Sequence, residues 1–347
     1  MTLLDHLRGH LDPGAPHLVS VSPAAAMPDG MVDIRGTHLA SALRPTITIG
    51  DTPAPLAFTS ANRITLRVPE GSISGDVVLA LGDHRSNGLP LNVAVPLADN
   101  LHPIANPAVD GEGNLYATFS GARGQDVPVS IFRIDRDFTV RPFVRGLPNA
   151  SGLAFGPDGY LYCSSRAEGT VYRISTDGAM AQWAEGMGIA TGLAFDDSGN
   201  LYVGDRSGTI FKLDTQGNVF VFATLEPSVS AYHLAFLDDG TLLVTGPTTS
   251  SNEAIHAISP EGEVTTYFRG LGRPQGMAVD TYGNVYVASS LRGERGIIRI
   301  TPDKEATVVV SGSGLVGLAF TDDGAAALAT TSALYTVAMD VEGRLVR

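Results

Sequence analysis

The feature that most constrains this chain is a motif that occurs six times between residues 106 and 347. Each copy joins one compact apolar run to a second through a short turn, as in TGLAFDDSGNLYVG from Thr191. In the five plainest copies, the residue after the glycine position recurs at intervals of 40, 41, 43 and 41, at Leu153, Leu193, Leu234, Met277 and Leu318. A fixed period in this range is typical of a solenoid or a β-propeller.

The content of one period favours the propeller. It holds four short runs, GLAF, NLYVG, TIFKLD and VFVFA, separated by the turn sequences DDSG, DRSG and DTQG. Such runs indicate antiparallel strands joined by hairpins, and four of them make a propeller blade. A β-helix would repeat over a shorter period, and a helical repeat would need an apolar spacing of three and four residues. We therefore predict an all-β fold whose residues 106–347 form a six-bladed β-propeller.

The residue types also order the strands within a blade. The compact GLAF run is predicted to be innermost, and the more charged last run is predicted to be the outer edge, where charge discourages aggregation. In the sixth copy this outer run is RLVR at residues 344–347. Because every copy holds four runs, closing the ring with a strand from elsewhere in the chain is not required.

Residues 16–95 lack the repeat and hold seven short strand-like runs, which predicts an immunoglobulin-like β-sandwich. This stretch resembles an IPT/TIG domain at four landmarks: Val21-Ser22-Pro23, Ile34–Thr37, Ile47–Gly50 and Val68-Pro69. The resemblance implies a spacer or an interaction surface. Residues 1–15 are predicted to be a lead-in segment and residues 96–105 a linker.

Composition excludes several classes of function. The formal net charge of −13 argues against nucleic-acid binding, which needs a basic surface. No run of eighteen apolar residues is present, so no membrane span is expected. The single cysteine, Cys163, is predicted to be a buried core residue. One cysteine and no apolar N-terminal stretch favour a cytoplasmic protein, or an extracytoplasmic one if the N-terminus has been trimmed.

We predict a ligand site at one mouth of the propeller channel. The residues just before or at the inner-strand glycine position are expected to face this mouth, namely Ser151, Thr191, Tyr232, His233 and Gln275. Loops at the same end bring arginines: Arg123, Arg166, Arg206, Arg273 and Arg292. Gathered arginines attract carboxylates and phosphates. The predicted partner is therefore a small anionic molecule, a glycan or a protein, while the acidic Asp-Gly turns fall at the opposite end.

The repeats resemble two groups of propellers. GLAFDDSGNLYVGD and GMAVDTYGNVYVAS resemble NHL repeats, and most of residues 106–347 is similar to the gluconolactonase-like lactonases. The second resemblance implies a divalent cation, such as calcium or zinc, held by Glu, Asn and Asp at the channel mouth. Here Gln275 stands where the family's motif has Asn, and Asp205 and Glu253 are the only nearby acids to consider. No cofactor is otherwise evident.

Two hypotheses follow. The first is a recognition module that captures its ligand at the Arg-lined mouth, with the sandwich as a spacer. The alternative is a metal-dependent hydrolase of the lactonase type with an altered metal site. The sequence favours the first, because it contains no readable catalytic set.

Overall fold

The computed structural model describes residues 14–344, apart from residues 42, 120, 122–125 and 250–252. Almost all of the predicted lead-in segment therefore lies outside the described residues. Every element of the described chain is a β-strand, and the predicted all-β class, with a sandwich followed by a propeller, is confirmed. The described residues contain no helix that has the length and apolarity to cross a bilayer. The chain divides into two compact units, residues 1–95 with 309–313, and residues 96–308 with 314–347.

The first unit is a sandwich of two sheets. One sheet has the order β1-β3-β7-β6, and the other has the order β2-β10-β8-β4-β5 with β9 paired to β8. The strands are β1 His17–Ser22, β2 Ala25–Ala26, β3 Met31–Thr37, β4 Thr46–Ile49, β5 Thr52–Ala54, β6 Leu56–Thr59, β7 Arg63–Arg67, β8 Gly75–Leu81, β9 His84–Arg85 and β10 Leu89–Val93. Each of the seven runs identified in the sequence overlaps one of these strands or more, and the short strands β2 and β9 lie between the runs.

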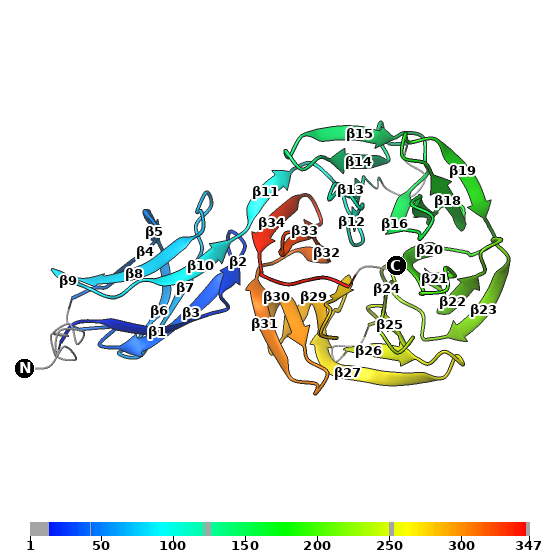
Figure 1. The fold of residues 1–347 in the computed structure, drawn as a ribbon. Coiled ribbons are helices and arrows are strands. Elements are labelled where there is room, and N and C mark those ends of the chain that lie inside the picture. Colours follow the sequence, from blue (N-terminus) through cyan, green and yellow to red (C-terminus); the bar gives the residue numbers. More distant parts are fainter. Residues whose placement is uncertain (1–13, 42, 120, 122–125, 250–252, 345–347) are drawn as a thin grey trace, which may run out of the picture. The chain divides into compact units, whose positions relative to one another are not determined.

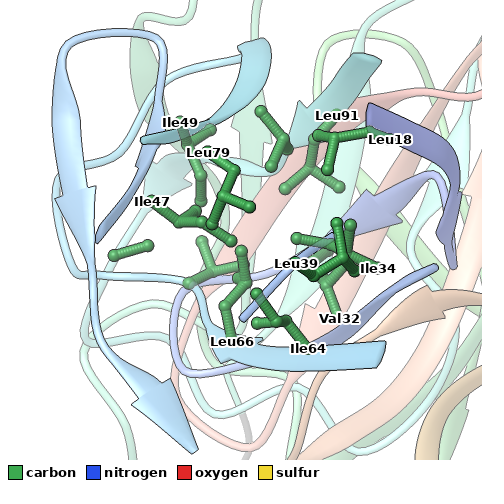
Figure 2. Packing of buried hydrophobic residues seen from close by; sticks show 14 of the residues in the cluster. Leu18, Val32, Ile34, Leu39, Ile47, Ile49, Ile64, Leu66, Leu79 and Leu91 are labelled. Atoms are coloured by element: carbon green, nitrogen blue, oxygen red, sulfur yellow. The ribbon is translucent and has the colours of Figure 1, made fainter. Parts of the chain in front are cut away.

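Alternation of apolar and polar residues builds the sandwich core. In β3, Val32 and Ile34 are buried while the residues between and beside them are more exposed. Ile64 and Leu66 in β7 repeat this pattern, because side chains two positions apart share one face of a strand. Figure 2 shows these side chains meeting those of the second sheet, including Leu79, in one apolar cluster.

The second unit is built from groups of strands that are consecutive in the sequence, with four strands in each of the first five groups and three in the sixth. The first four groups are β12 Ala108–Val109, β13 Leu115–Thr118, β14 Ile131–Ile134 and β15 Val140–Val144; β16 Ala150–Phe155, β17 Leu161–Ser165, β18 Thr170–Ile174 and β19 Met180–Ala184; β20 Ala190–Phe195, β21 Leu201–Asp205, β22 Thr209–Leu213 and β23 Val219–Thr224; β24 His233–Phe236, β25 Leu242–Thr245, β26 Glu253–Ile258 and β27 Val264–Gly272.

The last groups close the series. They are β28 Met277–Val279, β29 Val285–Leu291, β30 Glu294–Ile300 and β31 Ala306–Ser311; then β32 Leu315–Phe320, β33 Ala325–Thr330 and β34 Leu334–Ala338. Within this unit, Figure 1 shows the groups placed around a common centre, with the first strand of each group innermost. The predicted inner position of the GLAF run therefore matches the structure.

The outer edge of the last group differs from the prediction. The sheet has the order β11-β34-β33-β32, so its outer strand is β11, Val95–Ala98, which precedes the first repeat. The expected strand, residues 344–347, does not take this place: Arg344 lies in a C-terminal segment that leaves β34, and residues 345–347 lie outside the described residues. The predicted linker thus begins with a strand of the propeller sheet. The ring is closed by strands from the two ends of this unit.

Aromatic side chains join one group to the next. The ring of Tyr162 lies edge-on to Trp183 of its own sheet at 5.1 Å and to Phe195 of the following sheet at 5.0 Å, measured between ring centroids. Tyr202 repeats the arrangement with Phe222 and Phe236. Such edge-on pairs stabilise a fold by more than the burial of their apolar area alone. The tyrosine of the second strand in these groups therefore stabilises the contact with the next group.

Candidate functional site

The structure buries three of the residues predicted to face a ligand. Ser151, Thr191 and Tyr232 are exposed by only 1%, 2% and 2%. Thr191 Oγ1 donates to the carbonyl of Gly204 at 2.9 Å and accepts from the amide of Tyr232 at 3.0 Å. The Tyr232 hydroxyl donates to the carbonyl of Glu226, and burial raises the pKa of this phenol to about 12. The hydrogen bond between Thr191 and Tyr232 therefore links strand β20 to the residue just before β24.

His233 and Gln275 are also held inside the ring. Gln275 is half-buried, and its Nε2 donates to the carbonyl of Leu315 at 3.3 Å. His233 is exposed by 2%, and burial lowers the pKa of its imidazole to about 4. Its Nε2 has no hydrogen-bond partner among the described residues. The imidazole is consequently neutral near pH 7.

The predicted arginines divide into two kinds. Arg166 and Arg206 each use Nη2 to hold a loop carbonyl, that of Gly121 at 2.6 Å and that of Val229 at 2.7 Å. Arg273 and Arg292 are exposed, and both have left-handed backbone conformations with φ of 51° and 53°. Arg123 lies outside the described residues. Capture of an anion at this end of the channel stays a prediction.

Asp205 and Glu253, the two acids considered as metal ligands, instead accept hydrogen bonds that fix loops. Asp205 accepts from the amide of Ile189 at 2.8 Å and from the hydroxyl of Ser207. Glu253 Oε1 accepts from the amide of Thr248 at 2.9 Å, and burial raises the pKa of its carboxyl. Within the described ranges, no three His, Cys, Asp or Glu side chains gather closely enough to hold a metal ion. The lactonase alternative stays a prediction.

The predicted buried thiol is found. Cys163 in β17 is fully buried, and burial raises the pKa of its thiol to about 12. A thiol with this pKa is almost entirely protonated at neutral pH and is a poor nucleophile.

The acidic turns at the opposite end have a structural role. Asp110 Oδ1 accepts from the amides of Glu112 and Asn114 at 2.9 and 2.8 Å, and its Oδ2 accepts from the hydroxyl of Tyr116 at 3.0 Å. Asp280, which follows β28 in the fifth group, makes the same set of contacts. The Asp-x-x-Gly-Asn sequence therefore fixes the hairpin turn, as Asp does in Asx turns.

This end of the propeller contains a large cavity that the sequence interpretation missed. Its volume is about 1130 Å³, and it extends from the innermost strands to the acidic turns. The walls include the two residues that follow the glycine position in the inner strands of the second to sixth groups. The first is a leucine or methionine and the second is an alanine, as in Leu193, Ala194 and Ala278. Ala194 and Ala278 are partly exposed although they lie in the innermost strands. The repeated Asp-Gly turns were the sequence signal that could have indicated a cavity at this end, because several of these turns line it.

A C-terminal segment completes the cavity wall. We call residues 340–344 the strap, because they leave β34 and run across the ring, as the red ribbon in Figure 1 shows. The amide of Thr281 donates to the carbonyl of Glu342 at 3.0 Å, and the amide of Arg344 donates to the carbonyl of Val279 at 2.8 Å. The Arg344 side chain pairs with Asp238 at 2.5 Å. The strap is therefore tied to two other groups of the ring.

Comparisons with known proteins agree with this architecture. Residues 16–95 match the family model of the IPT/TIG domain. None of the curated proteins matches the sequence. Among solved structures, a putative gluconolactonase is similar at 17% identity and a TM-score of 0.60, over 73% of this chain and 94% of that one.

Two further structures match over nearly the full chain. An auxiliary nutrient binding protein from Bacteroides thetaiotaomicron is 11% identical with a TM-score of 0.56, over 93% of this chain and 98% of that one. A catalytically inactive virginiamycin B lyase from Staphylococcus aureus, solved with quinupristin, is 14% identical with a TM-score of 0.51, over 95% and 97%. At these identities the likeness shows a shared fold, and fold alone does not assign chemistry.

Proposed function

We propose that this protein is a small-molecule-binding module whose ligand occupies the cavity at the turn end of the propeller. The six groups of strands are taken as the six blades of one NHL-like ring, and the IPT/TIG unit serves as a spacer. The observation that carries the proposal is the cavity itself. Its volume of about 1130 Å³ slightly exceeds the range of about 300–1,000 Å³ that is typical of small-molecule sites, so it has room for an organic ligand.

The chemistry of the cavity wall supports binding in preference to catalysis. The wall is built mainly from apolar side chains of the inner strands, such as Leu153, Leu193 and Met277. Polar atoms of the neighbouring strands, such as Thr191 Oγ1, are already used within the protein. An apolar ligand that enters this space would gain roughly 25 cal/mol for each Å² of apolar surface removed from water.

Fluorescence of the neutral dye Nile red tests the proposal. We expect saturable binding to the native protein and loss of that binding in the double variant Ala278→Phe, Ala319→Phe, which fills the cavity from two inner strands. The matched control is Ala181→Phe, on the exposed face of β19. Equal dye binding by all three proteins, each shown to be folded by circular dichroism, would refute the cavity as the site.

A further inference from the structure

The residues around the cavity carry an excess of negative charge. Five carboxylates line it, and they belong to Asp110, Glu112, Asp322, Asp340 and Glu342. The described lining also contains two arginines, Arg133 and Arg344. A concave site lined by one sign of charge concentrates ligands of the opposite sign.

Both arginines are paired with carboxylates that do not line the cavity. Arg133 Nε lies 2.8 Å from Asp135 Oδ1. Arg344 lies 2.5 Å from Asp238 Oδ1 and 3.1 Å from Asp197 Oδ2. Both guanidinium groups are therefore already engaged by carboxylates of the protein, Arg344 by two and Arg133 by one that it shares with Arg141.

The lining carboxylates, in contrast, are largely unpaired. Glu112, Asp340 and Glu342 are exposed, and within the described part of the chain none of them forms an ion pair. Asp322 is paired with Arg136, and Asp110 accepts hydrogen bonds from its own turn. Among the described residues, three exposed carboxylates of the lining thus carry a negative charge that no ion pair compensates.

Aromatic rings in the wall are compatible with the same class of ligand, although most of them are largely buried and also pack edge-on against other rings of the protein. The inner strands of four groups each end in a phenylalanine that lines the cavity, Phe155, Phe195, Phe236 and Phe320. Tyr116 and Phe143 also line it. The negative face of an aromatic ring attracts cations, most of all alkylammonium groups that have been removed from water.

We infer that the ligand is an organic cation with an apolar body, such as a substituted ammonium compound. The inference rests on the proposed function. The apolar body lies between the inner strands, and the cationic group lies among the aromatic rings and the exposed carboxylates of the lining. Recognition is by charge and shape, and no covalent step is involved.

Three probes of equal chain length test this assignment: octyltrimethylammonium, 1-octanol and octanoate. Isothermal titration calorimetry of the full chain at low salt is expected to show octyltrimethylammonium binding about tenfold or more tightly than octanol, which corresponds to about 1.4 kcal/mol or more. Octanoate is expected to bind more weakly than octanol. In 0.3 M NaCl the preference for the cation should shrink, because salt screens exposed charges.

A variant separates charge from shape. In Glu112→Gln, Glu342→Gln, the cation should lose about threefold or more in affinity while the dissociation constant of octanol stays unchanged. The matched control is Glu185→Gln, an exposed acid near β19 that does not line the cavity. Equal affinities for cation and octanol, or tighter binding of octanoate, would overturn the inference and leave the binding function standing. Binding of none of the three probes would overturn both.

Discussion

Arg344 Nη1 donates a hydrogen bond to the backbone carbonyl of Phe236 at 2.9 Å, across 108 positions of sequence. The same side chain is exposed by only 15%, and it pairs with Asp197 and Asp238. These contacts join the strap to the inner strand β24 and to two turns. The Arg344 side chain therefore reinforces the backbone hydrogen bonds that tie the strap to Val279 and Thr281.

Replacing Arg344 should loosen the strap without unfolding the ring. Arg344→Ala is expected to cost about 1 kcal/mol of unfolding free energy, because both partner carboxylates are well exposed and screened. Hydrogen exchange should accelerate at the amide of Thr281, which donates to the strap carbonyl of Glu342. Arg141→Ala, which breaks an exposed pair on β15, is the control and should leave that amide unchanged. Unaltered exchange in Arg344→Ala would contradict the role of this side chain.

Close approach of inner strands predicts a strong effect at one glycine. A Cβ atom added at Gly192 would lie 2.4 Å from the carbonyl oxygen of Tyr232, which is backbone and cannot turn aside. Gly192→Ala should therefore destabilise the protein by roughly 1–3 kcal/mol, as overpacking does. Gly111→Ala, where no atom lies within 4 Å, should change stability by less than about 0.5 kcal/mol. Urea denaturation of both variants measures the difference, and equal values would count against the close approach.

The aromatic pairs between blades can be tested by removing a ring or only its hydroxyl. Tyr162→Ala should cost roughly 3–5 kcal/mol, because the ring packs against Trp183 and Phe195. Tyr162→Phe keeps both ring contacts and loses only the hydrogen bond to Asp158 at 2.9 Å, at a cost of about 1 kcal/mol. Similar losses in the two variants, measured by denaturant titration, would show that the hydroxyl and not the ring is important.

The buried imidazole of His233 predicts a dependence of stability on pH. Burial lowers its pKa from 6.5 to about 4, so the unfolded chain takes up the proton first as the pH falls. Protonation of His233 in the unfolded chain therefore lowers the free energy of unfolding as the pH falls. The loss is absent above pH 6.5 and builds up between pH 6.5 and 4, by at most about 1.4 kcal/mol per pH unit. His233→Gln should show a shallower fall than the native protein in urea titrations at pH 7.5, 6 and 5. His102→Gln, at an exposed position, should follow the native curve.

The repeat explains why most of the fold was predictable. An apolar run, an Asp-Gly turn and a second apolar run specify a hairpin locally, and a fixed period repeats the hairpin around the ring. Strand β11 could not be found in this way. Its sequence VPLA lies before the first copy and has no turn of its own, so only its pairing with β34 identifies it as a propeller strand.

The candidate site was much less predictable. The position before the inner-strand glycine is structurally equivalent in successive repeats, as Ser151 and Thr191 show. The sequence analysis predicted that these residues face an open channel mouth. Neighbouring inner strands lie so close together that these side chains are enclosed between strands. The cavity instead lies where turns of several groups meet the strap, and no local motif records that meeting.

The sheet that contains both β11 and β34 has a consequence for biosynthesis. Its outer strand is made by the ribosome before any repeat, and its other three strands are made after all the others. Pairings this distant in sequence form slowly, because a long loop must close first. The propeller unit of the nascent chain is therefore an incomplete ring whose strand β11 has no pairing partner until β34 is made.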